Sequence, residues 1–252
     1  MHGKYYTVTV PIEEKGNGET AFADADVLFN WTSFEIPKGA ACLKSIHIAM
    51  KGTNGADGNK LDMELYFAKS INGVAPSDFG ALNGAATAAL SAACRRNIIG
   101  HKFLDASERS DDEDLIGYNV WGAGVTTAAS TAVSDLILEG DPSYNGTEGY
   151  QTIWVAGIAK GAFDFGTAVA LNQGSGQAVT TVNTQLTTDG TDPRNVFMKG
   201  DVVQAQDNAA IGTVVSVDSA TTMTVDGVAA VLADDDTINW KYPLEFVLGF
   251  EY

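Results

Sequence analysis

The sequence contains few cysteines, prolines and histidines. Its 252 residues include Cys 2, Pro 6 and His 3. Cys42 and Cys94 lie far apart and lack the spacing of metal ligands, so we expect two small buried thiols in a reducing cytoplasm. His2, His47 and His101 have no His or Cys neighbour at zinc-binding spacing. The sequence therefore predicts neither a disulfide scaffold nor a metal centre.

Long apolar runs and basic residues are also scarce. No apolar run approaches the roughly 18 residues of a transmembrane helix, and residues 1–6 lack the apolar segment of a secretory signal. The chain has 15 Lys+Arg against 32 Asp+Glu, for a net charge of -17. Such an acidic chain repels phosphate backbones and anionic lipids, so we expect no nucleic acid and no membrane as partners. The acidity favours solubility, or docking on a basic partner surface.

No motif indicates an enzyme. Residues 16–21 formally match a dinucleotide-binding fingerprint, but the next segment is predicted as a strand instead of the required helix. No phosphate-binding loop and no nucleophile elbow are present. Acidic runs at 111–114 and 234–236 suggest calcium as an alternative, but they lack EF-hand spacing, and solvated turns are the preferred interpretation. We expect no catalytic residue, no cofactor and no metal site.

The sequence does contain many short runs that alternate apolar and polar residues, as half-buried strands do. Ile46 and Ile48, for example, alternate with Ser45 and His47. Strands are predicted at 4–12, 26–36, 42–51, 61–71, 97–104, 131–138, 152–159, 168–171 and 242–250. About eight strands before residue 172, with long connections between them, suit a jelly-roll-like β-sandwich.

A second group of short strands lies near the C-terminus. Residues 199–203, 211–218 and 222–225 alternate in the same way, and the last run ends at an Asp-Gly turn. The strand at 242–250 then returns to the first sheet. The sequence thus predicts an all-β fold with two domains: a jelly-roll-like β-sandwich of residues 1–171 plus 242–252, and a small inserted β-barrel of residues 172–241.

The aromatic residues allow two interpretations. Trp31, Trp121, Trp154 and Trp240 lie in or beside strand-like runs. Packing in a core or an interface is the expected role of such residues. A stacking platform for sugar is the alternative, and it would require exposed coplanar rings.

The C-terminal region resembles a module in virion structural proteins of tailed phages, notably marine ones. The resemblance rests on residues 199–225 and on the flanks 158–165 and 242–251, and it covers residues 150–252. The N-terminal part resembles jelly-roll capsid decoration proteins in general texture. Such proteins clamp capsomers after shell expansion and have no catalytic residues. The resemblance implies a non-enzymatic capsid decoration or cement protein of the virion, assembled in the host cytoplasm, with the major capsid protein as its partner.

Three alternatives remain beside this interpretation, in this order: a tail or fibre component, a carbohydrate-binding β-sandwich, and an enzyme. In the virion interpretation the chain works as a homo-oligomer, with a trimer as one form. Residues 72–97 are unusually apolar for a surface connection, and their alanines favour a short helix or a closely packed segment. Exposed apolar loops are costly unless a partner covers them. We therefore expect this segment to pack against another copy or the capsid floor through four residues: Val74, Phe79, Leu82 and Leu90.

Overall fold

The computed structural model describes residues 4–13, 21–50, 62–86, 92–104, 118–122, 136–144, 147–162, 169–172, 177–179, 182, 184–205, 209–227 and 230–252. Almost all regular structure in these residues is β-strand, and one short helix, α1 (Ala92–Asn97), precedes β5. All strand pairs are antiparallel, including the pair that joins the first strand to the last. The predicted all-β class is confirmed.

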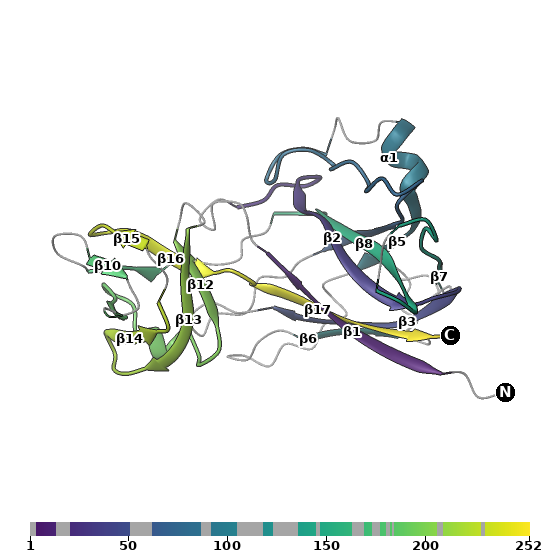
Figure 1. Cartoon of the computed structure of the whole chain (residues 1–252). Helices are drawn as coiled ribbons and strands as arrows, with labels where there is room; N and C mark the ends of the chain where they lie inside the picture. Colours follow the sequence, from purple (N-terminus) through teal and green to yellow (C-terminus); the bar gives the residue numbers. More distant parts are fainter. Residues whose placement is uncertain are drawn as a thin grey trace.

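Two sheets form the larger part of the molecule (Figure 1). The first sheet has the order β1-β17-β3-β6, and β7 also pairs with β3. Its strands are β1 (Tyr5–Ile12), β17 (Leu244–Glu251), β3 (Ala41–Met50), β6 (Tyr118–Gly122) and β7 (Leu136–Leu138). The second sheet has the order β2-β8-β4-β5. Its strands are β2 (Val27–Pro37), β8 (Tyr150–Ala159), β4 (Met63–Ala68) and β5 (Ile98–Leu104).

These two strand orders are those of a jelly roll. The chain repeatedly leaves one sheet for the other, so β1, β3 and β6 share a sheet with β17, and β2, β4 and β5 share the other with β8. This crossing pattern is the double Greek key of jelly-roll folds. The final strand, β17, lies between β1 and β3, in the sheet to which the sequence assigns it. The smaller β-module is therefore inserted between β8 and β17, the last two strands of the jelly roll.

The core between the two sheets follows the alternation of the sequence. Met63, Leu65 and Phe67 are fully buried on the inner face of β4. Phe246 of β17 meets Phe29 of β2 at a ring-centroid distance of 5.7 Å across the sandwich. Alternate residues of facing sheets thus form one shared apolar layer, which dominates the stability of such folds.

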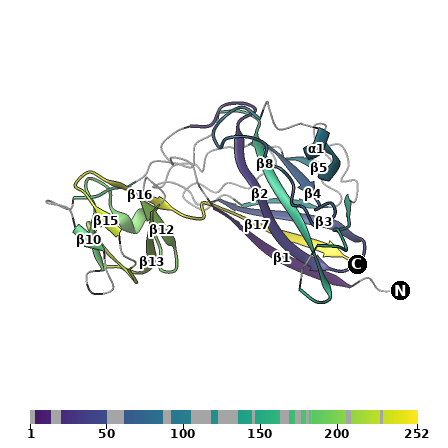
Figure 2. The ribbon, with the colours of Figure 1, turned by 45° about the horizontal axis from the view of Figure 1, so that its top comes forward.

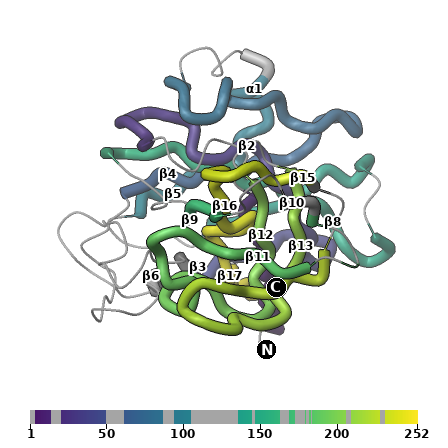
Figure 3. Tube along the Cα trace, turned by 90° about the vertical axis from the view of Figure 1, so that its left-hand side faces the viewer, coloured from purple at the N-terminus to yellow at the C-terminus, as the bar shows by residue number. Residues whose placement is uncertain are grey.

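The inserted module has its own sheet, of order β11-β14-β13-β12-β16-β9, and a two-stranded ribbon, β10-β15. The strands are β9 (Val169–Ala170), β10 (Gln177–Val179), β11 (Gln185–Thr187), β12 (Val202–Ala205), β13 (Ala210–Val217), β14 (Thr222–Val225), β15 (Ala230–Leu232) and β16 (Thr237–Trp240). A bridge between Leu171 and Thr188 joins the two outer ends of the six-stranded sheet. This bridge closes the sheet on itself as a small barrel, which Figure 3 shows from the module's side.

A buried carboxylate fastens the loop before β12 to the end of β16. Asp201 is 6% exposed, and its Oδ2 accepts hydrogen bonds from the Met198 amide at 3.0 Å and from the Trp240 indole at 3.2 Å. The Trp240 ring in turn packs on Phe197. Bonding of this kind allows a polar group to stand inside an apolar core.

The module's core and the sandwich core share no residue. Figure 2 shows the module beside one end of the sandwich, with the chain termini at the other end. We call the end that carries the termini the distal end. Whether residues 172–241 fold independently of the rest stays a prediction.

Candidate functional site

The described first part of the segment expected at an interface packs on the chain's own second sheet. Residues 72–86, which we call the cover, run back over the outer face of β2, β8 and β4. The Val27 amide donates to the Gly84 carbonyl, and the Asn83 amide donates to the Val27 carbonyl, each at 3.0 Å. The Ala86 amide likewise donates to the Ala25 carbonyl at 3.0 Å. The cover is thus hydrogen-bonded to the start of β2.

Phe79 anchors the middle of the cover. Its side chain is 0% exposed, and its ring centroid lies 4.8 Å from that of Trp31 and 5.1 Å from that of Tyr66. Asn30 holds the backbone on both sides, because its Oδ1 accepts from the Phe79 amide and its Nδ2 donates to the Gly80 carbonyl, both at 3.0 Å. The largest apolar side chain of the cover therefore packs against residues of its own chain.

This arrangement corrects the interface hypothesis for Phe79 and weakens it for Leu82. Phe79 is fully buried in a small core, so it offers no apolar surface to a partner, and Leu82 packs against the same core and is only partly exposed. Composition alone does not distinguish a loop that covers its own sheet from one that covers another chain. Val74 is 67% exposed and remains a candidate, and Leu90 lies outside the described residues.

Val74 lies at the distal end, in a tight turn that is closed by hydrogen bonds. The amides of Ile71 and Val74 each donate to the other's carbonyl at 3.0 Å, and Asn72 and Gly73 take positive φ of 52° and 76° between them. The Gly73 amide donates to Asp141 at 3.0 Å. This bond, followed by bonds from Ser143, lowers the pKa of Asp141 below its ordinary value of 3.8.

Other large exposed apolar side chains share the distal end with Val74. Ile137, 66% exposed, lies opposite Cys42 near the start of β3. Tyr5 and Tyr252, 75% and 42% exposed, lie where β1 begins and β17 ends. Tyr5 and Ile137 lie on strands, Val74 lies on a bonded turn, and Tyr252 follows β17 with its amide bonded to the Lys4 carbonyl. We call this set the distal patch: Tyr5, Val74, Ile137 and Tyr252.

A second group of residues gathers on the part of the outer face near β5. Glu64 lies 3.7 Å from both His101 Nε2 and Lys160 Nζ, and the Tyr66 ring stacks on His101 at a centroid distance of 6.0 Å. Burial, together with the hydrogen bond and the charge of Glu64, raises the pKa of Tyr66 to about 12. Tyr66 thus stays protonated at neutral pH and acts as a donor, not as a general base.

The other residues considered for chemistry have structural roles where they are described. Asp236 accepts a hydrogen bond from the Ala233 amide, as in an acidic turn. Three tryptophan indoles are engaged within the chain: Trp31 with Ser77, Trp154 with Ser70, and Trp240 with Asp201. Residues 111–114 lie outside the described part, and so does the side chain of Trp121.

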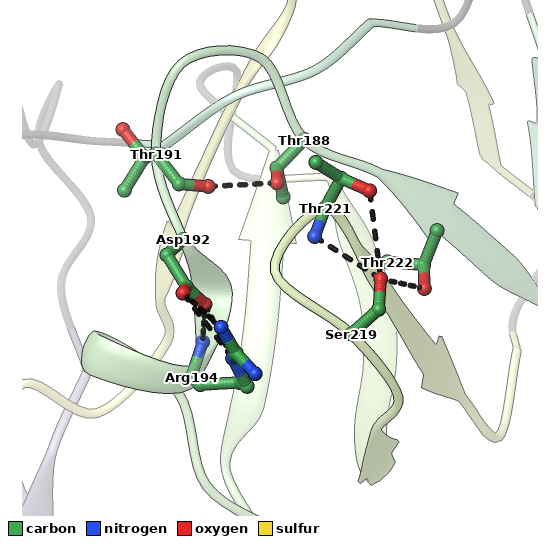
Figure 4. A network of polar contacts seen from close by, with 7 residues as sticks. All are labelled: Thr188, Thr191, Asp192, Arg194, Ser219, Thr221 and Thr222. Atoms are coloured by element: carbon green, nitrogen blue, oxygen red, sulfur yellow. Dashed lines mark hydrogen bonds and ion pairs between the residues drawn. The ribbon is translucent and has the colours of Figure 1, made fainter.

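Several polar contacts in the module join residues that are close together in the sequence. Asp192 accepts from the amide of Arg194 at the short 3-10 helix Pro193–Asn195, and it pairs with the guanidinium of the same residue at 2.6 Å. Thr188 donates to the Thr191 carbonyl, and Ser219 bonds the turn at Thr221 and Thr222 (Figure 4). These contacts join residues two or three apart and shape turns.

Burial also raises the pKa of the Cys94 thiol, which is therefore a poor nucleophile. No disulfide joins Cys94 to Cys42. Within the described residues, no group of three or more His, Cys, Asp or Glu is arranged to hold a metal ion. None of the described helices is long and apolar enough to cross a membrane.

Comparison of the chain with protein-family models and with curated proteins finds no match. The resemblance to phage virion proteins therefore stays a prediction. The distal patch is the feature that best fits a functional role, because its large apolar side chains are exposed to solvent on hydrogen-bonded backbone.

Proposed function

We propose that the chain is a non-enzymatic structural protein of a tailed-phage virion, acting as a capsid decoration or cement protein. The resemblance of residues 150–252 supports this proposal. The jelly-roll sandwich supports it too, because this fold recurs in viral capsid proteins, although it also serves lectins and cupins. A fold alone does not carry a function. The distal patch is the observation that favours a role in assembly.

The proposed mechanism is mechanical. Large apolar side chains exposed on rigid elements are typical of protein interfaces. A specific contact of standard size buries roughly 1,600 Å² in total. Each copy that binds across neighbouring capsid subunits stabilises the assembled shell by mass action, since it binds the shell and not the separated subunits. The major capsid protein is the proposed partner, and a basic surface on it would complement the net charge of -17.

Substitution in the distal patch tests the proposal. Val74→Asp combined with Ile137→Asp places two charges in the proposed interface, where an unpaired charge is expensive. Both side chains are more than half exposed, so the monomer should fold. We expect the double variant to lose occupancy of expanded capsid shells in co-sedimentation. The matched control, Val215→Asp with Val231→Asp, changes exposed valines of the module and should bind like the wild type.

If the patch variant occupies capsid shells as fully as the wild type, the distal patch is not part of the interface. Failure of the wild-type chain to bind shells at all would reject the capsid proposal. A tail or fibre component is the second candidate, and it would bind purified tails instead.

A further inference from the structure

Asn-Gly pairs are the places in a protein where asparagine most readily modifies itself. The backbone nitrogen of the glycine attacks Cγ of the asparagine side chain, because glycine has no side chain to hinder the approach. Ammonia leaves and a cyclic succinimide forms, which water then opens to aspartate or isoaspartate. The chain has such pairs at 17–18, 54–55, 72–73, 83–84 and 145–146, and the pairs 72–73 and 83–84 lie in the described residues.

These two pairs have similar backbone surroundings. Asn72 and Asn83 take positive φ of 52° and 50°, in the left-handed region that asparagine adopts more readily than most residues. Both turns are held by hydrogen bonds, since Ile71 and Val74 bond to each other around the first pair and Val27 bonds to both residues of the second. Neither φ nor the bonds that hold the turn therefore favours one pair over the other in this reaction.

The attacking nitrogen differs between the two pairs. The Gly73 amide donates to Oδ2 of Asp141 at 3.0 Å. This bond must break before the nitrogen can attack, and the carboxylate also repels the negative charge that develops during the attack. The Gly84 amide has no hydrogen-bond acceptor within the described residues, although the Gly84 carbonyl accepts from the Val27 amide. Of the two glycine nitrogens, that of Gly84 is therefore the one available for the reaction.

Asp141 is held in place beside the first pair. Its Oδ1 accepts hydrogen bonds from the amide and the hydroxyl of Ser143, at 2.9 and 2.6 Å. The bond from Gly73, followed by those from Ser143, lowers the pKa of Asp141, so the group is a carboxylate at neutral pH. A charged acceptor binds an amide more firmly than a neutral one, and it thus keeps the Gly73 nitrogen out of the reaction.

We propose that Asn83 is a site of spontaneous deamidation and that Asp141 protects Asn72 from the same reaction. Exposure alone predicts the opposite order, because Asn72 is exposed and Asn83 is half-buried. The order of the two rates thus distinguishes control by the glycine nitrogen from control by access to water. The inference goes beyond the proposed role in the virion, and it applies whether or not the chain binds a capsid.

Reaction at Asn83 changes the attachment of the cover. Isoaspartate routes the main chain through the side-chain carbons and so lengthens it by a CH2 group. The Asn83 amide and the Gly84 carbonyl then cannot both keep their bonds to Val27, and the cover loosens at the start of β2. The released ammonia does not return, so the modification accumulates with the age of each copy.

Peptide mass mapping of the full chain, before and after incubation at mildly alkaline pH, tests the order of the two rates. We expect deamidation at Asn83 to be faster than at Asn72 by about tenfold or more, the effect in rate of one hydrogen bond to a charged group. Gly84→Ala should slow the reaction at Asn83, and it fits the fold because the added Cβ lies 3.4 Å from its nearest neighbour, the Ala81 carbonyl oxygen. An Asn83 that stays intact, or an Asn72 that reacts as fast, would overturn the proposal.

Variants of Asp141 test its protective role. Asp141→Ala removes the acceptor and should raise the rate at Asn72 about tenfold or more, while the other site keeps its rate. Asp141→Asn keeps a side-chain oxygen for the Gly73 amide without the charge, so its rate should lie between those of the wild type and the alanine variant. Ser143→Ala is the matched control, since it leaves the acceptor in place and should leave the rate low.

Hydrogen exchange of the Val74 amide separates protection from folding. This amide closes the turn, and in Asp141→Asn its exchange should stay as slow as in the wild type while deamidation at Asn72 rises. A rate at Asn72 that neither Asp141 variant raises would overturn the protective role. Faster exchange of the Val74 amide in Asp141→Asn would overturn it too, because Asp141 would then act only by holding the turn.

Discussion

Truncation of Phe79 tests whether the cover belongs to the chain's own fold. Phe79→Ala removes a fully buried ring that contacts Trp31 and Tyr66, and it leaves the backbone bond to Asn30 in place. Phe→Ala in a core typically costs about 3–5 kcal/mol, including the lost ring pairs. The whole free energy of unfolding of a native protein is only about 5–15 kcal/mol. The variant should therefore lose a large share of its stability.

The assay is thermal unfolding, supported by hydrogen exchange. A loss of about 3 kcal/mol should lower Tm by about 6 °C or more for a chain of this size. Amides of Asn83 and Ala86, which bond the cover to β2, should exchange faster than in the wild type. Val74→Ala is the control, since an exposed side chain should change stability by less than about 0.5 kcal/mol. A Phe79→Ala protein that melts like the wild type, with unchanged exchange, would refute the burial of Phe79.

Three further predictions concern the module, acid and metal. Replacement of residues 175–240 by a short Gly-Ser bridge should leave a folded sandwich, because the two cores are separate; an unfolded product by circular dichroism would show that they depend on each other. The pKa values of Glu35 and Asp141 are lowered, chiefly because the amides of Thr147 and Gly73 bond to their carboxylates. Their contribution to the free energy of unfolding is therefore complete above about pH 4.5 and is lost as pH falls through the lowered pKa values. Asp141→Asn should flatten this acid dependence in urea titrations, and an unchanged slope would contradict it. EDTA should leave Tm unchanged; a large fall would point to calcium in the acidic loops.

Much of the fold could be predicted from periodicity. The alternation of Met63, Leu65 and Phe67 predicts their inner face, and all three are fully buried. Ile46 and Ile48 are likewise buried, with His47 between them half-buried. Period-two patterns are strong signals because one shifted residue would expose a whole apolar face.

The candidate site was less accessible to sequence reasoning. An apolar loop has the same composition whether it covers its own sheet or another chain, so the sequence placed Phe79 at an interface although its side chain is buried within the chain. One signal was available: the outer face of β8 carries Ala156 and Ile158 and needs a cover, as their burial in the small core with Phe79 shows.

The position of the chain in a virus particle tests the central proposal most directly. Electron cryo-microscopy of virions from a phage that encodes the chain would locate it. The account predicts copies on the icosahedral shell, each contacting capsid subunits through the distal patch of Tyr5, Val74, Ile137 and Tyr252. Copies on the tail axis alone, or particles without the chain, would contradict it.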